Sequence, residues 1–126
     1  FLLKWISIMT ITPMLLEMGM GTSLRSGSYT KAACRAVKNA LWRNSINLDE
    51  VFGAEKSDMI ISVEIACQKP NQVDIKPVIA EFPYGTVTAI VVPGGLDIHN
   101  AHKSDAHPAI IAHAAINIAL DLDPRR

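Results

Sequence analysis

The chain has 126 residues, 49% of them hydrophobic and 19% charged, a length and composition that suit one ordinary globular domain spanning residues 1–126. Its 12 basic and 12 acidic side chains cancel to a formal net charge of zero, which provides no basic surface for nucleic acid or an anionic membrane. Neither is an expected partner, whereas near-zero charge mildly favours a homo-oligomer.

The first 20 residues are largely apolar but do not predict a membrane anchor. Lys4, Pro13 and Glu17 interrupt the run, well short of the ~20 continuous apolar residues that a spanning helix needs. A small-x-small cleavage site does not follow, so a signal peptide is also a poor match. We therefore expect a soluble chain.

The first regular elements are a strand and a helix joined by a loop. We expect residues 1–13 to form a peripheral extension or strand, and residues 14–18 a firmer strand. Residues 19–28 are rich in Gly and Ser and predict a loop. The helix is expected over residues 30–44, because apolar residues recur at spacings of 3 and 4 at Ala33, Val37, Ala40 and Leu41.

The remaining elements follow from β-branched runs, prolines and apolar spacing. We expect a short turn or single helical turn over residues 48–52, a strand over 59–67, a short helix within 74–81, a strand over 86–92, a polar His-rich loop over 97–107 and a helix over 108–120.

These elements predict an α+β domain with an α/β-like order of strand, helix, strand, short helix, strand and helix. One small mixed sheet covered on one face by two long helices is the economical architecture for so few strands. The bare face of such a sheet would then need another subunit.

Short segments along the chain also share a pattern with a known family: Glu17-Met18-Gly19-Met20-Gly21, Tyr29-Thr30-Lys31-Ala32-Ala33, Arg35-Ala36-Val37, Asn44-Ser45 and Phe82-Pro83-Tyr84-Gly85. Over residues 14–120 the chain resembles a small family of conserved hypothetical proteins from bacteria and plants, marked by an N-terminal G-x-G-x-D-x-H-G motif. That family has no established activity, so the resemblance implies a topology and little about chemistry.

The chain departs from this motif at three positions. Gly19 and Gly21 hold its first two glycines, whereas Ser23, Arg25 and Ser26 stand in place of its Asp, His and last Gly. If that Asp and His are the family's reactive or metal-binding pair, the resemblance implies that this chain has lost or moved the function. By element order alone, the chain is also similar to chorismate-mutase-like and ferredoxin-like folds and to the repeats of cyanuric acid hydrolases. The chorismate-mutase-like folds and the hydrolase repeats place sites between units.

The strongest candidate site is the segment between the first strand and the first helix. Glycines let the backbone approach a ligand, serines add hydroxyls, arginine adds a planar fork, and the helix N-terminus adds the positive end of a dipole. A carboxylate or phosphate suits this chemistry, although a plain connecting turn is the alternative interpretation. The candidate binding residues are Gly19, Gly21, Ser23, Arg25, Ser26, Lys31 and Arg35.

Two acids are candidate general bases. Glu17 and Glu64 each interrupt an apolar strand, and a buried carboxyl with a raised pKa could serve in catalysis. Lys31 and Arg35 could partner them. The alternative is that both acids lie on a solvated strand face.

The histidines gather in one stretch without a recognisable metal spacing. His99, His102, Asp105 and His107 are of the types that bind Zn²⁺, but their spacing matches no known metal motif. We therefore favour no metal site and predict no cofactor. His113 is expected on a helix surface or at an interface.

Cys34 and Cys67 lie within helix and strand patterns, which predicts buried thiols in a reducing compartment and hence a cytoplasmic protein. Because no activating base lies beside Cys67, we expect it in the core rather than as a nucleophile. The leading hypothesis is a module that binds a small anion near a subunit interface. The alternatives are a hydrolase or isomerase of small cyclic or carboxylated compounds, and a structural oligomer without a ligand.

Overall fold

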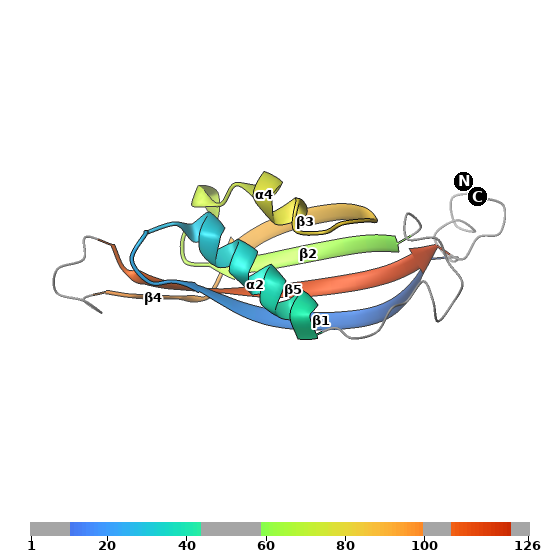
Figure 1. Cartoon of the computed structure of the whole chain (residues 1–126), viewed down its shortest axis with the longest axis horizontal. Coiled ribbons are helices and arrows are strands. Elements are labelled where there is room, and N and C mark those ends of the chain that lie inside the picture. The colour runs from blue at the N-terminus through green and yellow to red at the C-terminus, as the bar shows by residue number, and fades with distance from the viewer. Residues whose placement is uncertain (1–10, 44–58, 100–106, 122–126) are drawn as a thin grey trace.

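The computed structural model describes residues 11–43, 59–99 and 107–121. These residues form a mixed five-stranded sheet with two α-helices, an α+β arrangement (Figure 1). The elements are β1 (Ile11–Ser23), α2 (Tyr29–Arg43), β2 (Met59–Cys67), the 3-10 helix η2 (Pro70–Gln72), α4 (Ile75–Ile79), β3 (Thr86–Pro93), β4 (Leu96–Ile98) and β5 (Ala109–Asp121). Neither α2 nor α4 is long and apolar enough to cross a membrane.

Strand β5 lies inside the sheet and pairs with β1, β2 and β4. The strand order is β1-β5-β2-β3, with β1 and β2 antiparallel to β5, and β2 parallel to β3. The short β4 pairs with β5 at residues 109–111, beyond the point where β2 ends. Both edges of β5 are therefore paired along most of its length.

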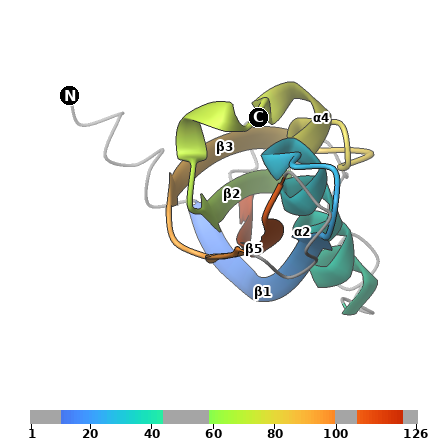
Figure 2. The same ribbon diagram turned by 90° about the vertical axis from the view of Figure 1, so that its left-hand side faces the viewer.

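The described helices lie on one side of this sheet (Figures 1 and 2). The Oγ of Ser28 accepts a hydrogen bond from the backbone N–H of Lys31 at 3.0 Å, which caps the start of α2 as expected for a serine before a helix. The helix turns small residues toward the sheet, where they are fully buried: Ala32, Ala33, Ala36, Val37 and Ala40. On the opposite side of the sheet the described residues include no helix, and we call that side the open face.

Gly19 and Gly21 lie within β1, so the expectation of a loop from residue 19 is wrong for residues 19–23. A Cβ on Gly19 would lie 2.3 Å from the carbonyl oxygen of Ala36, and one on Gly21 would lie 2.2 Å from the amide nitrogen of Ala36. The two glycines therefore allow α2 to approach the strand backbone, and their role is packing rather than a turn.

The helix expected over residues 108–120 is also wrong, because this segment forms β5. Nearly every position in it is apolar, so spacings of 3 and 4 and a spacing of 2 both fit. In the structure, buried and exposed side chains alternate every two residues, as in a strand with one covered face. From residue 110 onward the buried side chains are at alternate positions: Ile110, Ala112, Ala114, Ile116, Ile118 and Leu120.

The strands expected over residues 14–18, 59–67 and 86–92, the helix expected from residue 30 and the short helix within 74–81 are confirmed. Residues 1–10 of the expected N-terminal extension and residue 44 of the expected helix lie outside the described residues. The mixed sheet is confirmed, but only one long helix covers it. The expected loop over residues 97–107 begins with β4 instead. The helical turn expected over 48–52 lies outside the described residues.

A cationic candidate site at the end of β1

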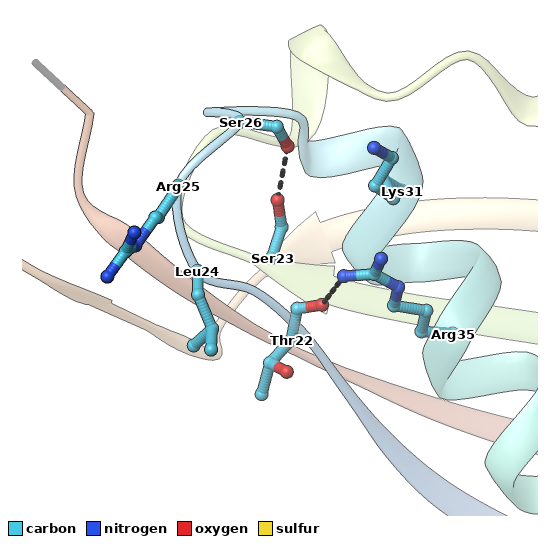
Figure 3. Close-up of a pocket in the computed structure, with 7 residues that line it drawn as sticks. All are labelled: Thr22, Ser23, Leu24, Arg25, Ser26, Lys31 and Arg35. Atoms are coloured by element: carbon cyan, nitrogen blue, oxygen red, sulfur yellow. Dashed lines mark hydrogen bonds between the residues drawn. The ribbon is translucent and has the colours of Figure 1, made fainter. Parts of the chain in front are cut away.

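Five of the seven predicted binding residues line one cavity of about 500 Å³ (Figure 3). It lies where β1 passes into the turn before α2, and we call it the cationic pocket. None of its seven described lining residues is acidic, whereas three are basic. The lining residues are Thr22, Ser23, Leu24, Arg25, Ser26, Lys31 and Arg35.

Hydroxyl contacts hold the turn in place. The buried Ser23 is the last residue of β1, and its Oγ lies 2.6 Å from the Oγ of Ser26 (Figure 3). The backbone N–H of Ser28 donates to the same Ser26 Oγ at 3.3 Å. At Gly27 the backbone φ is 70°, and an added Cβ would lie 2.6 Å from His107 Nδ1, so a glycine fits there on both counts. The turn is thus tied to both elements that flank it.

Two side chains of α2 satisfy backbone groups on the outer edge of β1. Arg35 donates from Nη1 to the carbonyl oxygen of Thr22 at 2.7 Å, and the N–H of Met20 donates to Asn39 Oδ1 at 3.1 Å. Residues four apart on a helix lie on one face, and residues two apart on a strand point to the same edge. The hydrogen bond to β1 therefore holds the Arg35 side chain in place at the edge of the pocket.

The three cations lie on two sides of the pocket. Lys31 and Arg35 belong to the first two turns of α2, where the helix dipole adds partial positive charge. Arg25 lies across the turn, and its guanidinium points away from the other two (Figure 3). The pocket therefore has two cations, Lys31 and Arg35, on the side of α2, where Ser23 and Ser26 also lie.

Gly19 and Gly21 do not line this pocket, and neither do the two candidate acids. Glu17 is half-buried on the side of the sheet that faces α2. Glu64 is exposed on the open face, where it lines a second cavity of about 390 Å³ with Met18 and other residues. The acids therefore lie on opposite sides of the sheet and do not form a pair.

The histidine-rich stretch does not assemble a metal site within the described residues. His99 is exposed after β4, and His107 is exposed beside Gly27, whereas His102 and Asp105 lie outside the described residues. In the parts of the chain that the structure describes, no group of three His, Cys, Asp or Glu residues could hold a metal ion. His113 lies exposed on the open face of β5, not on a helix.

A buried polar cluster beneath the start of α2 was not expected from the sequence. The hydroxyl of Tyr29 donates to Asp97 Oδ2, and Asp97 Oδ1 is buried without a hydrogen-bond partner in the described structure. Burial, followed by the hydrogen bond and the charge of Asp97, raises the pKa of Tyr29 to about 12. Burial also raises the pKa of the Cys67 thiol, although the backbone at Lys69 partly offsets this. The sequence feature that could have indicated this cluster is Leu96-Asp97-Ile98, in which an acid stands between two apolar residues.

Comparison with known proteins gives a family and a related structure. The family description "conserved hypothetical protein" (Lin0512_fam) matches residues 13–118. A crystal structure from Nostoc punctiforme, described as an FtsZ-like protein of unknown function, is 32% identical with a TM-score of 0.80. The match covers 88% of this chain and 97% of that one. No curated protein matches the sequence.

Proposed function

The chain belongs to this family of conserved hypothetical proteins, and from that premise we propose that it binds a small anionic ligand in the cationic pocket. The observation that supports the proposal is a cavity with Lys31 and Arg35 beside two serine hydroxyls, Arg25 across the turn, and no acid in its described lining. Lys31 and Arg35 near one another favour an anion between them, because like charges repel and an anion relieves that repulsion.

The donor set suits a carboxylate or a phosphate. A guanidinium presents a planar fork to two oxygens, a lysine supplies a point charge, and the hydroxyls of Ser23 and Ser26 can donate to further oxygens. The cavity of about 500 Å³ falls within the ~300–1,000 Å³ typical of small-molecule sites. Because Lys31 and Arg25 are exposed, water screens their charges and we expect modest affinity for a simple anion.

A binding module needs only these groups, whereas a hydrolase or isomerase also needs an acid or base beside the ligand. Glu17 and Glu64 lie outside the lining of the cationic pocket. The geometry therefore favours binding over catalysis at this site.

Thermal denaturation with added inorganic phosphate, at constant ionic strength, tests the proposal. A ligand at ten times its dissociation constant stabilises the native state by about 1.4 kcal/mol, and we expect the wild type to show a shift of this order. Arg25→Ala and Lys31→Ala should reduce it. Arg35→Ala is a poorer choice because Arg35 also holds the edge of β1.

Lys69→Ala and Lys76→Ala are matched controls, since both lysines are exposed and neither lines the pocket. They should respond to phosphate as the wild type does. A parallel series with acetate and citrate separates a preference for phosphate from one for carboxylates. If no anion stabilises the wild type, or if Lys31→Ala responds like Lys76→Ala, the proposal is wrong.

A further inference from the structure

The open face of the sheet carries a concentration of exposed apolar side chains. Ten large hydrophobic residues are exposed in the described structure, and the strand pairing places six of them on this face. Their exposed fractions run from 41% to 65%. Soluble monomers rarely leave so many apolar side chains together in water. The six are Leu16, Met18, Met20, Ile90, Leu96 and Ile98.

We propose that two copies of this chain pack open face to open face as a symmetric dimer. The strand register indicates how the faces fit. Glu64 lies opposite Ala115, and His113 lies opposite Ala66, so the acid and the imidazole are diagonal neighbours on adjacent strands. They are the titratable side chains at the centre of the face, within an otherwise apolar cavity.

One acid beside one imidazole makes the face complementary to itself. In a two-fold interface, residue i of one copy meets residue j of the other, and the reverse holds as well. An axis between the stacked sheets that bisects the line from Glu64 to His113 places each Glu64 opposite His113 of the partner subunit. An imidazole donates a hydrogen bond to a carboxylate whether it is neutral or charged. The arrangement therefore needs no partner other than a second copy.

The area of the face is also of the right order. The eight register pairs of β2 with β5 and the four-strand width give a flat footprint of about 500 Å², from ~3.3 Å per residue and ~4.8 Å per strand. A standard specific interface buries ~800 Å² of accessible surface on each partner. Because side chains stand out from the flat footprint, the accessible area is larger than 500 Å². We expect a reversible dimer rather than an obligate one.

Association through the β1 edge is disfavoured. Arg35 already donates to the outward-facing carbonyl oxygen of Thr22, and Asn39 already accepts from the outward-facing N–H of Met20. A strand from a second copy would have to displace both side chains before it could pair there. Unlike this edge, the open face can take part in association without breaking these hydrogen bonds.

Sedimentation equilibrium from micromolar to millimolar protein tests the dimer. Met18 is 65% exposed on the edge strand β1, beside the cavity that holds Glu64 and His113. Met18→Glu adds a second carboxylate beside the one imidazole of this cavity, and the dimer would bury that excess charge. We expect this variant to raise the dimer dissociation constant on the order of 100-fold. Trp42→Glu is the matched control, because Trp42 is 89% exposed on α2, away from the face. It should associate as the wild type does.

A charge exchange tests the two-fold pairing itself. His113→Glu should weaken the dimer about tenfold or more, because it places carboxylates opposite each other. Adding Glu64→His to it restores one acid and one imidazole, and should recover most of the wild-type affinity. Circular dichroism melting of each variant separates lost association from lost folding. A wild type that stays monomeric at millimolar concentration, or a dimer that Met18→Glu leaves intact, overturns the proposal. A double variant no better than His113→Glu alone overturns the proposed pairing.

Discussion

Most residues of the cationic pocket could be predicted from the sequence, because they lie close together along the chain. These pocket residues lie at the end of β1, in the turn that follows and in the first turns of α2, so a correct helix start is enough to bring them together. They are Ser23, Arg25, Ser26, Lys31 and Arg35. The binding roles given to Gly19 and Gly21 had no such support. Glycine fits a close approach by any group, and here that group is α2.

The pair of Tyr29 and Asp97 shows the opposite case. The two residues are separated by 68 positions, and they meet only because β4 joins β5 beneath the start of α2. No local pattern encodes such a contact. An acid between two apolar residues signals burial, but it does not say which donor will satisfy the carboxylate.

The raised pKa of Tyr29 makes a prediction about alkaline stability. The pKa is about 12 in the folded protein, against about 10 in an unfolded chain. The neutral phenol therefore stabilises the fold fully below about pH 10, and this contribution is lost as the pH rises toward about 12. Between these values we expect the wild type to lose roughly 2–3 kcal/mol more than Tyr29→Phe.

Urea denaturation of both proteins across this range measures the difference. At neutral pH, Tyr29→Phe should itself be less stable by about 1–3 kcal/mol, because Asp97 loses its buried donor. The ultraviolet absorbance of tyrosinate gives an independent check. A tyrosine that titrates near pH 10 in the wild type and is missing from Tyr29→Phe would contradict the shift.

At the scale of elements, the strands and helices with an unambiguous period were predictable and β5 was not. In β2 the exposed Ser62 and Glu64 mark one face, so the alternation can be read directly. In β5, alanines and isoleucines occupy both faces, and the polar residues His113 and Asn117 are spaced as a helix allows. Only pairing with strands on both sides decides the conformation, and that information is not local.

The contact of β1 with α2 gives a prediction at this scale. Gly21→Ala should destabilise the fold by about 1–3 kcal/mol or more, because its Cβ would lie 2.3 Å from the carbonyl oxygen of Ala32 and 2.2 Å from the Ala36 nitrogen. Both contacts are backbone, so relief requires the helix to move. Chemical denaturation measures the effect. Thr86→Ala, at an exposed position of β3, is the control and should change stability by less than about 0.5 kcal/mol. Equal stability of Gly21→Ala and wild type would show that α2 can shift freely.

At the scale of the molecule, the sequence predicts a sheet with one covered face and one bare face, and the described helices do lie on one side of the sheet. It also predicted two long helices over the sheet, which is wrong because the second is β5. Moving β5 from the helix layer into the sheet widens the bare face. It also places His113 beside Glu64, which is the pairing on which the proposed dimer depends.

The capped edge of β1 gives the last prediction, which concerns how the whole molecule avoids uncontrolled association. Asn39→Leu removes the acceptor for the Met20 N–H, whereas Asn39→Asp keeps an oxygen at the same place. An unpaired edge group is a template for strand addition, so we expect Asn39→Leu to aggregate faster on warming and Asn39→Asp to behave as the wild type. Turbidity and thioflavin fluorescence measure the aggregation rates, with each variant held at a temperature at which the same fraction of the protein is unfolded. Equal rates for the two variants would mean that the hydrogen bond from Met20 to Asn39 does not protect this edge.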